Sequence, residues 1–147
     1  MKKRKGISAI VFIKERNNFK FLLLRRKLNW VGWEFLKGGR KKGENEKECL
    51  KREIKEEIGM KNFSFKKTPF FHEFRYSRPY KKDKIRWDSA KNRIYVVRIF
   101  SNKIKLDKNE HSSFKWFSKK DVLKKLTWKD YKILFEKIMN SKNYFNI

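Results

Sequence analysis

Carboxylate side chains gather in one short segment of this chain. Six of the 16 acidic residues lie within residues 44–57, as Glu44, Glu46, Glu48, Glu53, Glu56 and Glu57. Like charges four residues apart on a helix, such as Glu53 and Glu57, repel each other unless a counter-charge is present. Carboxylates are the ligands that Mg²⁺ and Mn²⁺ prefer. The segment is therefore a candidate site for a hard divalent cation, and the alternative is a solvated acidic face neutralised by lysines.

Residues 46–58 are predicted to form the helix that carries these carboxylates. Its apolar residues fall in one stripe at i, i+4 and i+8, and its last three glutamates fall in an adjoining arc about 100° wide. The stripe consists of Leu50, Ile54 and Ile58, and the arc consists of Glu53, Glu56 and Glu57. One side of the helix can thus pack on a sheet while the next side presents three carboxylates together.

The spacing around this helix matches a known motif at every defined position. The chain reads Gly38-x5-Glu44-x7-Arg52-Glu53-Ile54-x-Glu56-Glu57-x-Gly59-Met60. This segment, residues 38–60, resembles the Nudix box, which belongs to enzymes that hydrolyse a nucleoside diphosphate linked to another group. The wider chain resembles the small Nudix hydrolases. That resemblance implies a single domain over residues 1–147, with an α/β (α+β) fold: an α/β/α sandwich with a mixed sheet and a loop–helix–loop motif.

The resemblance also implies roles for the residues of the motif. The carboxylates of Glu53, Glu56 and Glu57 match the family's ligands for Mg²⁺, for which Mn²⁺ is an expected substitute. The Gly38 carbonyl matches a further ligand, and Arg52 matches the residue that orients the glutamates. One acid must accept the proton of the attacking water, and the sequence leaves two helix candidates, Glu53 and Glu57, open.

A further acid is expected from a distant part of the chain. Glu110 stands six residues before Trp116, which is similar to a pattern in relatives that act on RNA 5′ ends and on dinucleoside tetraphosphates. That similarity implies that Glu110 approaches the metals from the opposite side and is a third candidate for the base. The alternative is a glutamate on a surface loop. The adjacent His111 is either a hydrogen-bonded loop histidine or a group that holds phosphate or acts as a base.

Residues before the motif bear on the substrate. The run Trp33-Glu34-Phe35-Leu36-Lys37-Gly38 is similar to the Trp-x-Phe-Pro-Lys-Gly of dinucleoside tetraphosphate hydrolases, RNA pyrophosphohydrolases and decapping enzymes, with Leu36 where those families have proline. An ammonium beside backbone N–H groups suits polyphosphate. We therefore expect Lys37 to contact phosphate, and Arg26, at the end of the second predicted strand, is another candidate.

A later strand, predicted at 92–101, offers three more candidates for substrate binding. Arg93 and Tyr95 alternate along it and so share a face, which Lys91, just before the strand, would join if the alternation begins there. A lysine and a tyrosine near this strand serve polyphosphate and base in relatives, and Tyr95 could stack on a base. Packing in the core is the alternative for Tyr95. Residues 70–80 mix aromatics with cations, which suits a nucleotide, a single strand or simply a sheet edge.

The elements that must position these residues follow from hydrophobic periodicity and turn signals. Strands are predicted at 6–14, 19–26, 33–36, 62–76, 92–101 and 112–117, and loops at 37–43 and 78–89. Helices are predicted at 46–58, at 119–126 with Ser118 as N-cap, and at 128–140 with Thr127 as N-cap. Mixed strands and helices with hairpin signals favour a mixed sheet covered by helices.

Composition excludes several classes of protein. The 147 residues are 39% hydrophobic and 16% aromatic, which is too apolar for a disordered chain. With one cysteine, Cys49, the chain has no internal disulfide framework. No apolar run approaches 18 residues, so no membrane association is expected. The apolar run 7–13 after a basic lead ends at Lys14 without a cleavage site, so we expect a cytoplasmic protein.

Together these features predict a Mg²⁺-dependent Nudix hydrolase. The first candidate substrate is a dinucleoside polyphosphate, with diadenosine tetraphosphate as the type, cleaved asymmetrically. The second is a pyrophosphate or cap at RNA 5′ ends, and the third is a damaged nucleoside triphosphate. A net charge of +26 also allows a basic RNA-binding module on a Nudix scaffold, although such a module would not need all the glutamates. Base preference, metal count and oligomeric state stay open.

Overall fold

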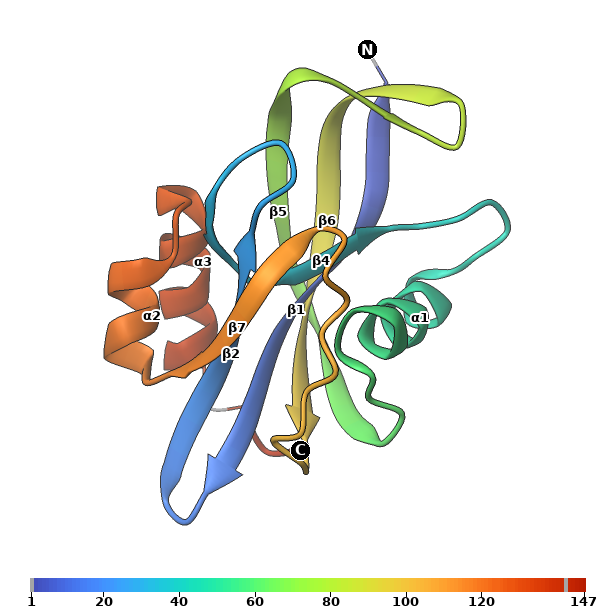
Figure 1. Cartoon of the computed structure of the whole chain (residues 1–147). Helices are drawn as coiled ribbons and strands as arrows, with labels where there is room; N and C mark the ends of the chain where they lie inside the picture. Colours follow the sequence, from blue (N-terminus) through green and yellow to red (C-terminus); the bar gives the residue numbers. More distant parts are fainter. Residues whose placement is uncertain (1, 142) are drawn as a thin grey trace.

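A seven-stranded mixed sheet forms the centre of the molecule in the computed structural model, which describes residues 2–141 and 143–147 (Figure 1). The strands are β1 (Lys3–Glu15), β2 (Asn18–Arg26), β3 (Gly32–Glu34), β4 (Leu36–Gly39), β5 (Phe63–Lys82), β6 (Ile85–Ile99) and β7 (His111–Phe117). They run in the order β3-β2-β1-β6-β5, while β4 pairs with β1 and β7 pairs with β2. Only the β1–β6 pairing among these is parallel.

Helices cover both faces of this sheet. The helix α1 (Glu46–Ile58) lies on one face, and α2 (Lys119–Lys125) and α3 (Lys129–Asn140) lie on the other (Figure 1). The predicted α/β/α sandwich with a mixed sheet is therefore confirmed. No helix in the described part of the chain is long and apolar enough to cross a membrane.

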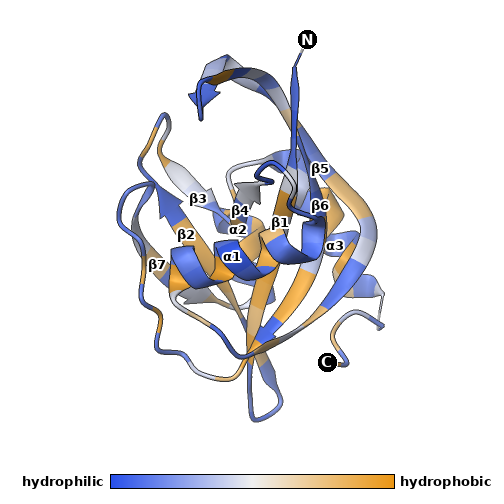
Figure 2. Ribbon diagram, turned by 90° about the vertical axis from the view of Figure 1, so that its right-hand side faces the viewer, coloured by the Kyte–Doolittle hydropathy of each residue, from blue (hydrophilic) through white to orange (hydrophobic). Residues whose placement is uncertain are grey.

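Two hydrophobic cores separate the layers because β1 is apolar on both faces. Ile7, Ala9 and Val11 pack with the apolar stripe of α1, while Ile10 and Phe12 pack with α2 and α3. A strand buried on both sides reads as a continuous apolar run, which is what residues 6–13 show. In Figure 2 the hydrophobic strands lie behind α1, whose outward surface is hydrophilic.

The ends of α1 are fixed by local capping. Asn45 and Glu48 form a reciprocal capping box, in which each side chain accepts the other's backbone N–H. At the other end Gly59 has φ 71°, and its N–H donates to the carbonyls of Ile54 and Lys55. The predicted bounds, 46–58, and the left-handed glycine cap are both confirmed.

The predicted loop at 78–89 is wrong. Residues 63–82 and 85–99 instead form one long antiparallel hairpin, which turns at Asp83 and Lys84 with φ of 54° and 66°. A two-residue turn with positive φ at both positions normally has Asn or Asp followed by Gly, so Asp83 without a following glycine is only a weak sequence signal. Register shifts between Lys67 and Phe71 and between Arg75 and Tyr80 accommodate the two prolines of the strand.

Two smaller expectations also differ from the structure. Thr127 does not cap α3: its Oγ1 accepts the N–H of Trp33 at 3.1 Å, and α3 starts after Trp128 with no side-chain cap. Gly38 and Gly39 do not belong to a loop, because they form the end of β4 and pair with Ile7 and Gly6 of β1. The pairing holds the start of the motif rigidly against the sheet.

Candidate metal and phosphate site

A cavity of about 1260 Å³ opens between α1 and the β5–β6 hairpin. One group of its lining residues, here called the acidic wall, consists of Glu53, Glu56, Glu57 and Glu110. A second group, here called the aromatic wall, consists of Trp30, Lys37, Phe74 and Trp128. The predicted residues Arg26, Lys37 and Gly38 line the same cavity, so most of the candidate site converges there.

Arg52 ties the acidic wall to the loop before α1. Its guanidinium donates to both carboxylate oxygens of Glu44 at 2.7 and 2.8 Å, and to the carbonyl of Gly39 at 2.9 Å. The same group bonds Glu53 at 2.7 Å and Glu56 at 3.2 Å. Hydrogen bonding to Arg52 lowers the pKa of Glu44 to about 2. The arginine thus lies where the resemblance implies, in contact with two of the expected metal ligands.

Glu53 lies directly against the backbone of Gly38. A Cβ added to Gly38 would stand 2.0 Å from the Glu53 carboxylate carbon, so only glycine permits this approach. Burial raises the pKa of Glu53 to about 7, although Arg52 acts in the opposite direction. The Gly38 carbonyl accepts a weak hydrogen bond from Cys49 Sγ at 3.7 Å. The first residue of the motif and a carboxylate of its helix are therefore adjacent in the fold.

A buried chain of charged groups supports Glu57 from behind. His111 Nε2 lies 2.7 Å from Glu34 Oε2, and His111 Nδ1 lies 3.4 Å from Glu57 Oε2. Burial alone would lower the pKa of His111, but the Glu34 and Glu57 carboxylates outweigh it and raise the pKa to about 9. Burial likewise opposes the ionisation of Glu34, yet Lys37, His111 and Arg26 lower its pKa to about 2. Both pKa shifts favour the charged forms, an imidazolium beside a carboxylate.

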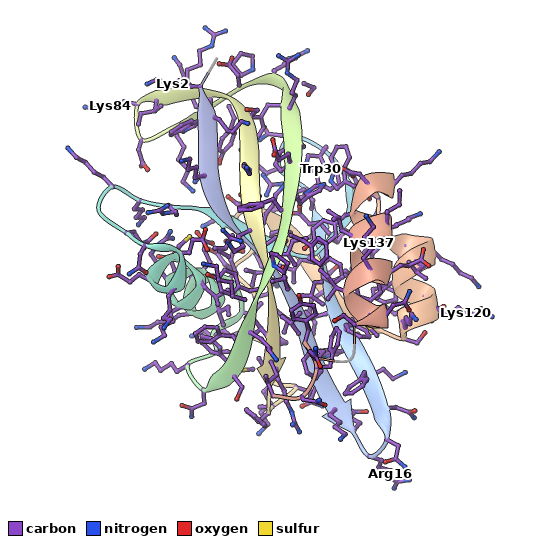
Figure 3. The ribbon with its side chains drawn as sticks, turned by 180° about the vertical axis from the view of Figure 1, so that it is seen from behind. Lys2, Arg16, Trp30, Lys84, Lys120 and Lys137 are labelled. Atoms are coloured by element: carbon purple, nitrogen blue, oxygen red, sulfur yellow. The ribbon has the colours of Figure 1, made fainter. Side chains whose placement is uncertain are left out.

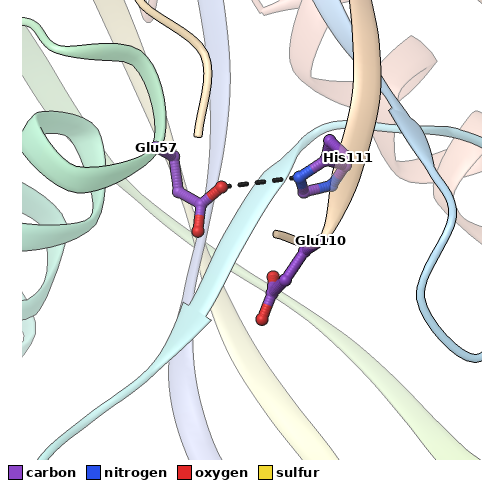
Figure 4. A group of neighbouring side chains, drawn as sticks. All are labelled: Glu57, Glu110 and His111. Atoms are coloured by element: carbon purple, nitrogen blue, oxygen red, sulfur yellow. Dashed lines mark ion pairs between the residues drawn. The ribbon is translucent and has the colours of Figure 1, made fainter. Parts of the chain in front are cut away.

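Glu110 enters the cavity from the strand side, opposite α1. Ligand atoms of Glu57, Glu110 and His111 all lie within 4.8 Å of one another, and Figure 4 shows Glu57 facing the other two across the gap. Arg26 Nη1 holds Glu110 Oε2 at 3.1 Å, and Arg26 Nε donates to the carbonyl of Leu28. Arg26 is itself buried. The structure thus places Arg26 as a support for Glu110.

The donor set of the acidic wall fits a hard divalent cation. It offers carboxylate oxygens from two sides of one gap, which is the chemistry that Mg²⁺ and Mn²⁺ require. Glu57 Oε2 is buried and makes no hydrogen bond within the described residues. The imidazole of His111, 3.4 Å away, pairs with this oxygen without a hydrogen bond, and a bound cation would satisfy it more fully. Glu53, Glu56, Glu57 and Glu110 are accordingly the groups that would hold the ion.

The aromatic wall presents flat rings with a cation among them. Phe74 and Trp128 are nearly parallel, at 13°, with centroids 6.4 Å apart, and Trp30 meets Trp128 edge-on at 5.2 Å. Lys37 Nζ lies 4.4 Å from the centroid of Phe74 and 3.1 Å from Glu34 Oε1. The ammonium is therefore held between the ring of Phe74 and the carboxylate of Glu34.

Three predicted substrate-binding residues are not brought to this cavity. Ala90 and Asn92 of β6 line it, so the alternating residues Lys91, Arg93 and Tyr95 point to the α1 face. Arg93 Nε and Tyr95 Oη bond Glu46 Oε1, at 2.9 and 2.8 Å respectively. Lys91 lies over the ring of Phe71. The shared face is as predicted, but Arg93 and Tyr95 there anchor the first turn of α1 to the sheet, while Lys91 contacts β5.

The sequence reading missed Glu34, Trp30 and Trp128. Glu34 carries one recognisable signal, since it is an acid between Trp33 and Phe35 in a strongly apolar stretch. A buried acid in that setting needs a partner, and His111 lies 77 residues away in sequence. Trp30 lies in a loop and Trp128 lies just before α3, and no sequence pattern indicates that the two residues are close in space.

Comparison with known proteins agrees with this geometry. The sequence model of the NUDIX domain matches residues 2–137. The structure is similar to an Ap4A hydrolase from C. elegans (TM-score 0.72, 21% identity, 93% of this chain and 96% of that one). It is also similar to a dihydroneopterin triphosphate pyrophosphohydrolase from E. coli (TM-score 0.77, 16% identity, 96% and 100%) and to a MutT protein from Methanosarcina mazei (TM-score 0.74, 21% identity, 95% and 94%). At these identities the likeness shows the fold. No curated protein matches the sequence.

Proposed function

The chain belongs to the Nudix family and hydrolyses a phosphoric anhydride bond, and we propose that its substrate is a dinucleoside polyphosphate such as diadenosine tetraphosphate. The observation that carries this proposal is the cavity itself, which is lined by carboxylates together with aromatic rings and a lysine. Such a pairing suits a molecule with a phosphate chain at its centre and a base at its end. The likeness to the C. elegans Ap4A hydrolase supports the same choice.

The acidic wall would bind Mg²⁺, with Mn²⁺ as a substitute. When bound, the ion supplies charge neutralisation for the phosphates and makes water a stronger acid. Arg52 holds Glu53 and Glu56 in fixed positions, and the Glu34–His111 pair holds Glu57, so the ligands are placed before the ion arrives. Preorganised ligands of this kind cost little reorganisation during the reaction.

The proton of the attacking water goes to a carboxylate of the acidic wall. Glu53, Glu57 and Glu110 remain the candidates for this base. Glu53 Oε1 already accepts from Arg52, and Glu110 Oε2 accepts from Arg26, so each is oriented by one guanidinium. Glu57 Oε2 has no hydrogen bond in the described structure. Single Gln variants of the three, compared by kcat over a range of pH, would identify the acceptor.

The aromatic wall would hold the nucleoside. A base can stack on Phe74 and Trp128, and such stacking is worth about 1–3 kcal/mol per base. Lys37 lies over Phe74 and lines the same cavity as the acidic wall, where it would contact a phosphate adjoining the nucleoside. This arrangement separates recognition of the base from cleavage of the phosphate chain.

Removal of pyrophosphate from RNA 5′ ends is the second candidate function. The specific observation in its favour is that the cations of the cavity continue along the β5–β6 hairpin to Lys84 and Arg86, beyond the residues that line the cavity. A small substrate would not reach cations outside the cavity, whereas the phosphates of an RNA strand could contact them.

One hydrolysis panel tests both candidates. The panel contains diadenosine tetraphosphate, 5′-triphosphorylated RNA, nucleoside triphosphates and ADP-ribose, each with Mg²⁺ or Mn²⁺ and at one salt concentration. The proposal expects ATP and AMP from diadenosine tetraphosphate at the highest kcat/KM. Faster release of pyrophosphate from the RNA would favour the second candidate, and preference for a nucleoside triphosphate would overturn both.

Two further predictions from the sequence accompany this proposal. We propose that residues 1–147 act as a single domain, supported by the NUDIX match over residues 2–137. We also propose a cytoplasmic location. Cys49 is a free, buried thiol whose pKa burial raises to about 12, and such a thiol is compatible with a reducing compartment.

A further inference from the structure

Residues 75–86, here called the basic arm, form the tip of the β5–β6 hairpin. Figure 1 shows the hairpin extending beyond the body of the sheet, at the end where the N-terminus lies. Six of these twelve residues are cationic and only Asp83 is acidic. The cations are Arg75, Arg78, Lys81, Lys82, Lys84 and Arg86. The arm therefore carries five net positive charges at one end of the molecule.

The lysine-rich composition of the whole chain does not account for this arm. Residues 119–137, on α2 and α3, show that background: seven lysines, three acids and no arginine over nineteen residues. The basic arm has a higher charge density and contains three of the chain's arginines. Arginine is the cation suited to bidentate phosphate contacts and to stacking on bases.

The arrangement of charge on the arm is unfavourable for the free protein. Lys81 and Arg86 stand directly opposite each other in the β5–β6 register. Both are exposed, and neither forms an ion pair with an acid in the described part of the chain. Like charges directly opposite each other in a ladder are destabilising, and a bound anion relieves that cost.

Aromatic rings alternate with these cations. The rings of Tyr76 and Tyr80 are stacked at 5.1 Å and 21°, and Tyr80 pairs across the hairpin with Trp87. Arg4 lies 5.5 Å from the ring of Tyr80, and Lys2 lies 6.0 Å from that of Trp87. Cations that track a backbone beside rings that accept bases of any kind are the elements of single-strand recognition.

We propose that the basic arm binds a single strand of nucleic acid. Arg78, Tyr80 and Lys81 line the cavity, and Lys84 and Arg86 continue the path outside it. A strand on this path would run from the hairpin tip toward the acidic wall. A duplex fits less well, because its bases are stacked internally and cannot reach the tyrosines.

The test compares two charge-matched double variants of the full chain. K84N/R86Q removes two charges from the arm beyond the cavity, and asparagine tolerates the positive φ of Lys84. K120Q/K137Q removes two charges from exposed lysines on α2 and α3. Figure 3 shows Lys84 beside Lys2 at the hairpin end and Lys120 and Lys137 on the helices. Binding of a 3′-fluorescein oligouridylate of about 12 nucleotides is followed by anisotropy in EDTA, over a range of salt.

The expected result is a change in salt dependence for the arm variant alone. Each lost phosphate contact lowers the slope of log K against log salt by about 0.7, so K84N/R86Q should lose about 1.4 and the helix variant nothing. Y80L should weaken binding about fivefold or more with an unchanged slope, because it removes stacking and no charge. Equal slope changes in both doubles, equal affinity for duplex RNA of the same length, or no binding at low salt would each overturn the proposal.

This test is independent of the proposed hydrolysis. Binding is measured without metal, so an inactive protein could still show the arm-specific slope change. The opposite outcome is also possible: the protein hydrolyses diadenosine tetraphosphate, but both double variants show the same salt dependence of binding. The hydrolase proposal would then stand, and the proposal that the basic arm binds a single strand would be rejected.

Discussion

The two walls of the cavity are built by opposite means. The acidic wall and its supports, Glu34 and His111, are largely buried and cross-linked by ion pairs of 2.7–3.4 Å. The aromatic wall and the basic arm consist of rings that stack and of cations, of which Lys81 and Arg86 are exposed and pair with no acid among the described residues. The difference teaches that the acidic wall is arranged before any ligand binds, whereas the Lys81–Arg86 pair of the arm depends on a ligand for compensation.

The largest expected effect follows from removing a carboxylate of the acidic wall. Glu57→Gln should lower kcat about 10³-fold, because a lost metal ligand removes about 4 kcal/mol of transition-state stabilisation. Steady-state hydrolysis of diadenosine tetraphosphate measures it. Glu136→Gln, an exposed position on α3, is the matched control and should retain full activity. Wild-type turnover by the Glu57 variant would show that the acidic wall is only a charged surface.

The second effect tests whether the support behind Glu57 matters. Glu34→Gln should weaken Mn²⁺ binding about 10–100-fold, since partners behind a metal ligand contribute that much. Calorimetry without substrate measures this affinity, and circular dichroism confirms the fold. Glu15→Gln, at the exposed end of β1, serves as control. Unchanged affinity would mean that Glu57 is positioned by α1 alone.

The third effect concerns the aromatic wall. Trp128→Leu should raise KM for diadenosine tetraphosphate about tenfold with little change in kcat, because stacking binds ground state and transition state alike. Inhibition by inorganic tripolyphosphate, which has no base, should be unaffected. Equal losses of affinity for diadenosine tetraphosphate and tripolyphosphate would show that Trp128 acts by packing the hairpin against α3.

The smallest effect is a pH dependence of stability in metal-free buffer. The pKa of His111 is raised in the folded protein to about 9, so its stabilising contribution is complete below pH 6.5 and lost as pH rises toward 9. The Tm difference between the wild type and His111→Gln should shrink by about 10 degrees over that interval, for a contribution of about 3 kcal/mol. Glu53 is present in both proteins, so its own titration largely cancels. A constant difference would show that His111 is neutral in the fold.

Sequence reasoning succeeded where the determinants are local. Helix α1 has its own cap residues, apolar stripe and terminal glycine, so both its bounds and the arc of Glu53, Glu56 and Glu57 follow from spacing. The β5–β6 hairpin was not predicted, because Asp83 and Lys84 adopt positive φ without a glycine or asparagine to mark the turn.

Placement across the sheet required the structure. Alternation correctly put Arg93 and Tyr95 on one face, but the choice between the two faces depends on the neighbouring strands. Glu34 needed its partner His111, which only the β2–β7 pairing brings near. Long-range pairing of this kind leaves little trace in a single sequence.

The most direct measurement of the central claim is the product pattern from diadenosine tetraphosphate. The account predicts ATP and AMP in equal amounts, loss of turnover on adding EDTA, and recovery on adding excess Mg²⁺. Turnover that survives EDTA, or cleavage to two molecules of ADP, would contradict it.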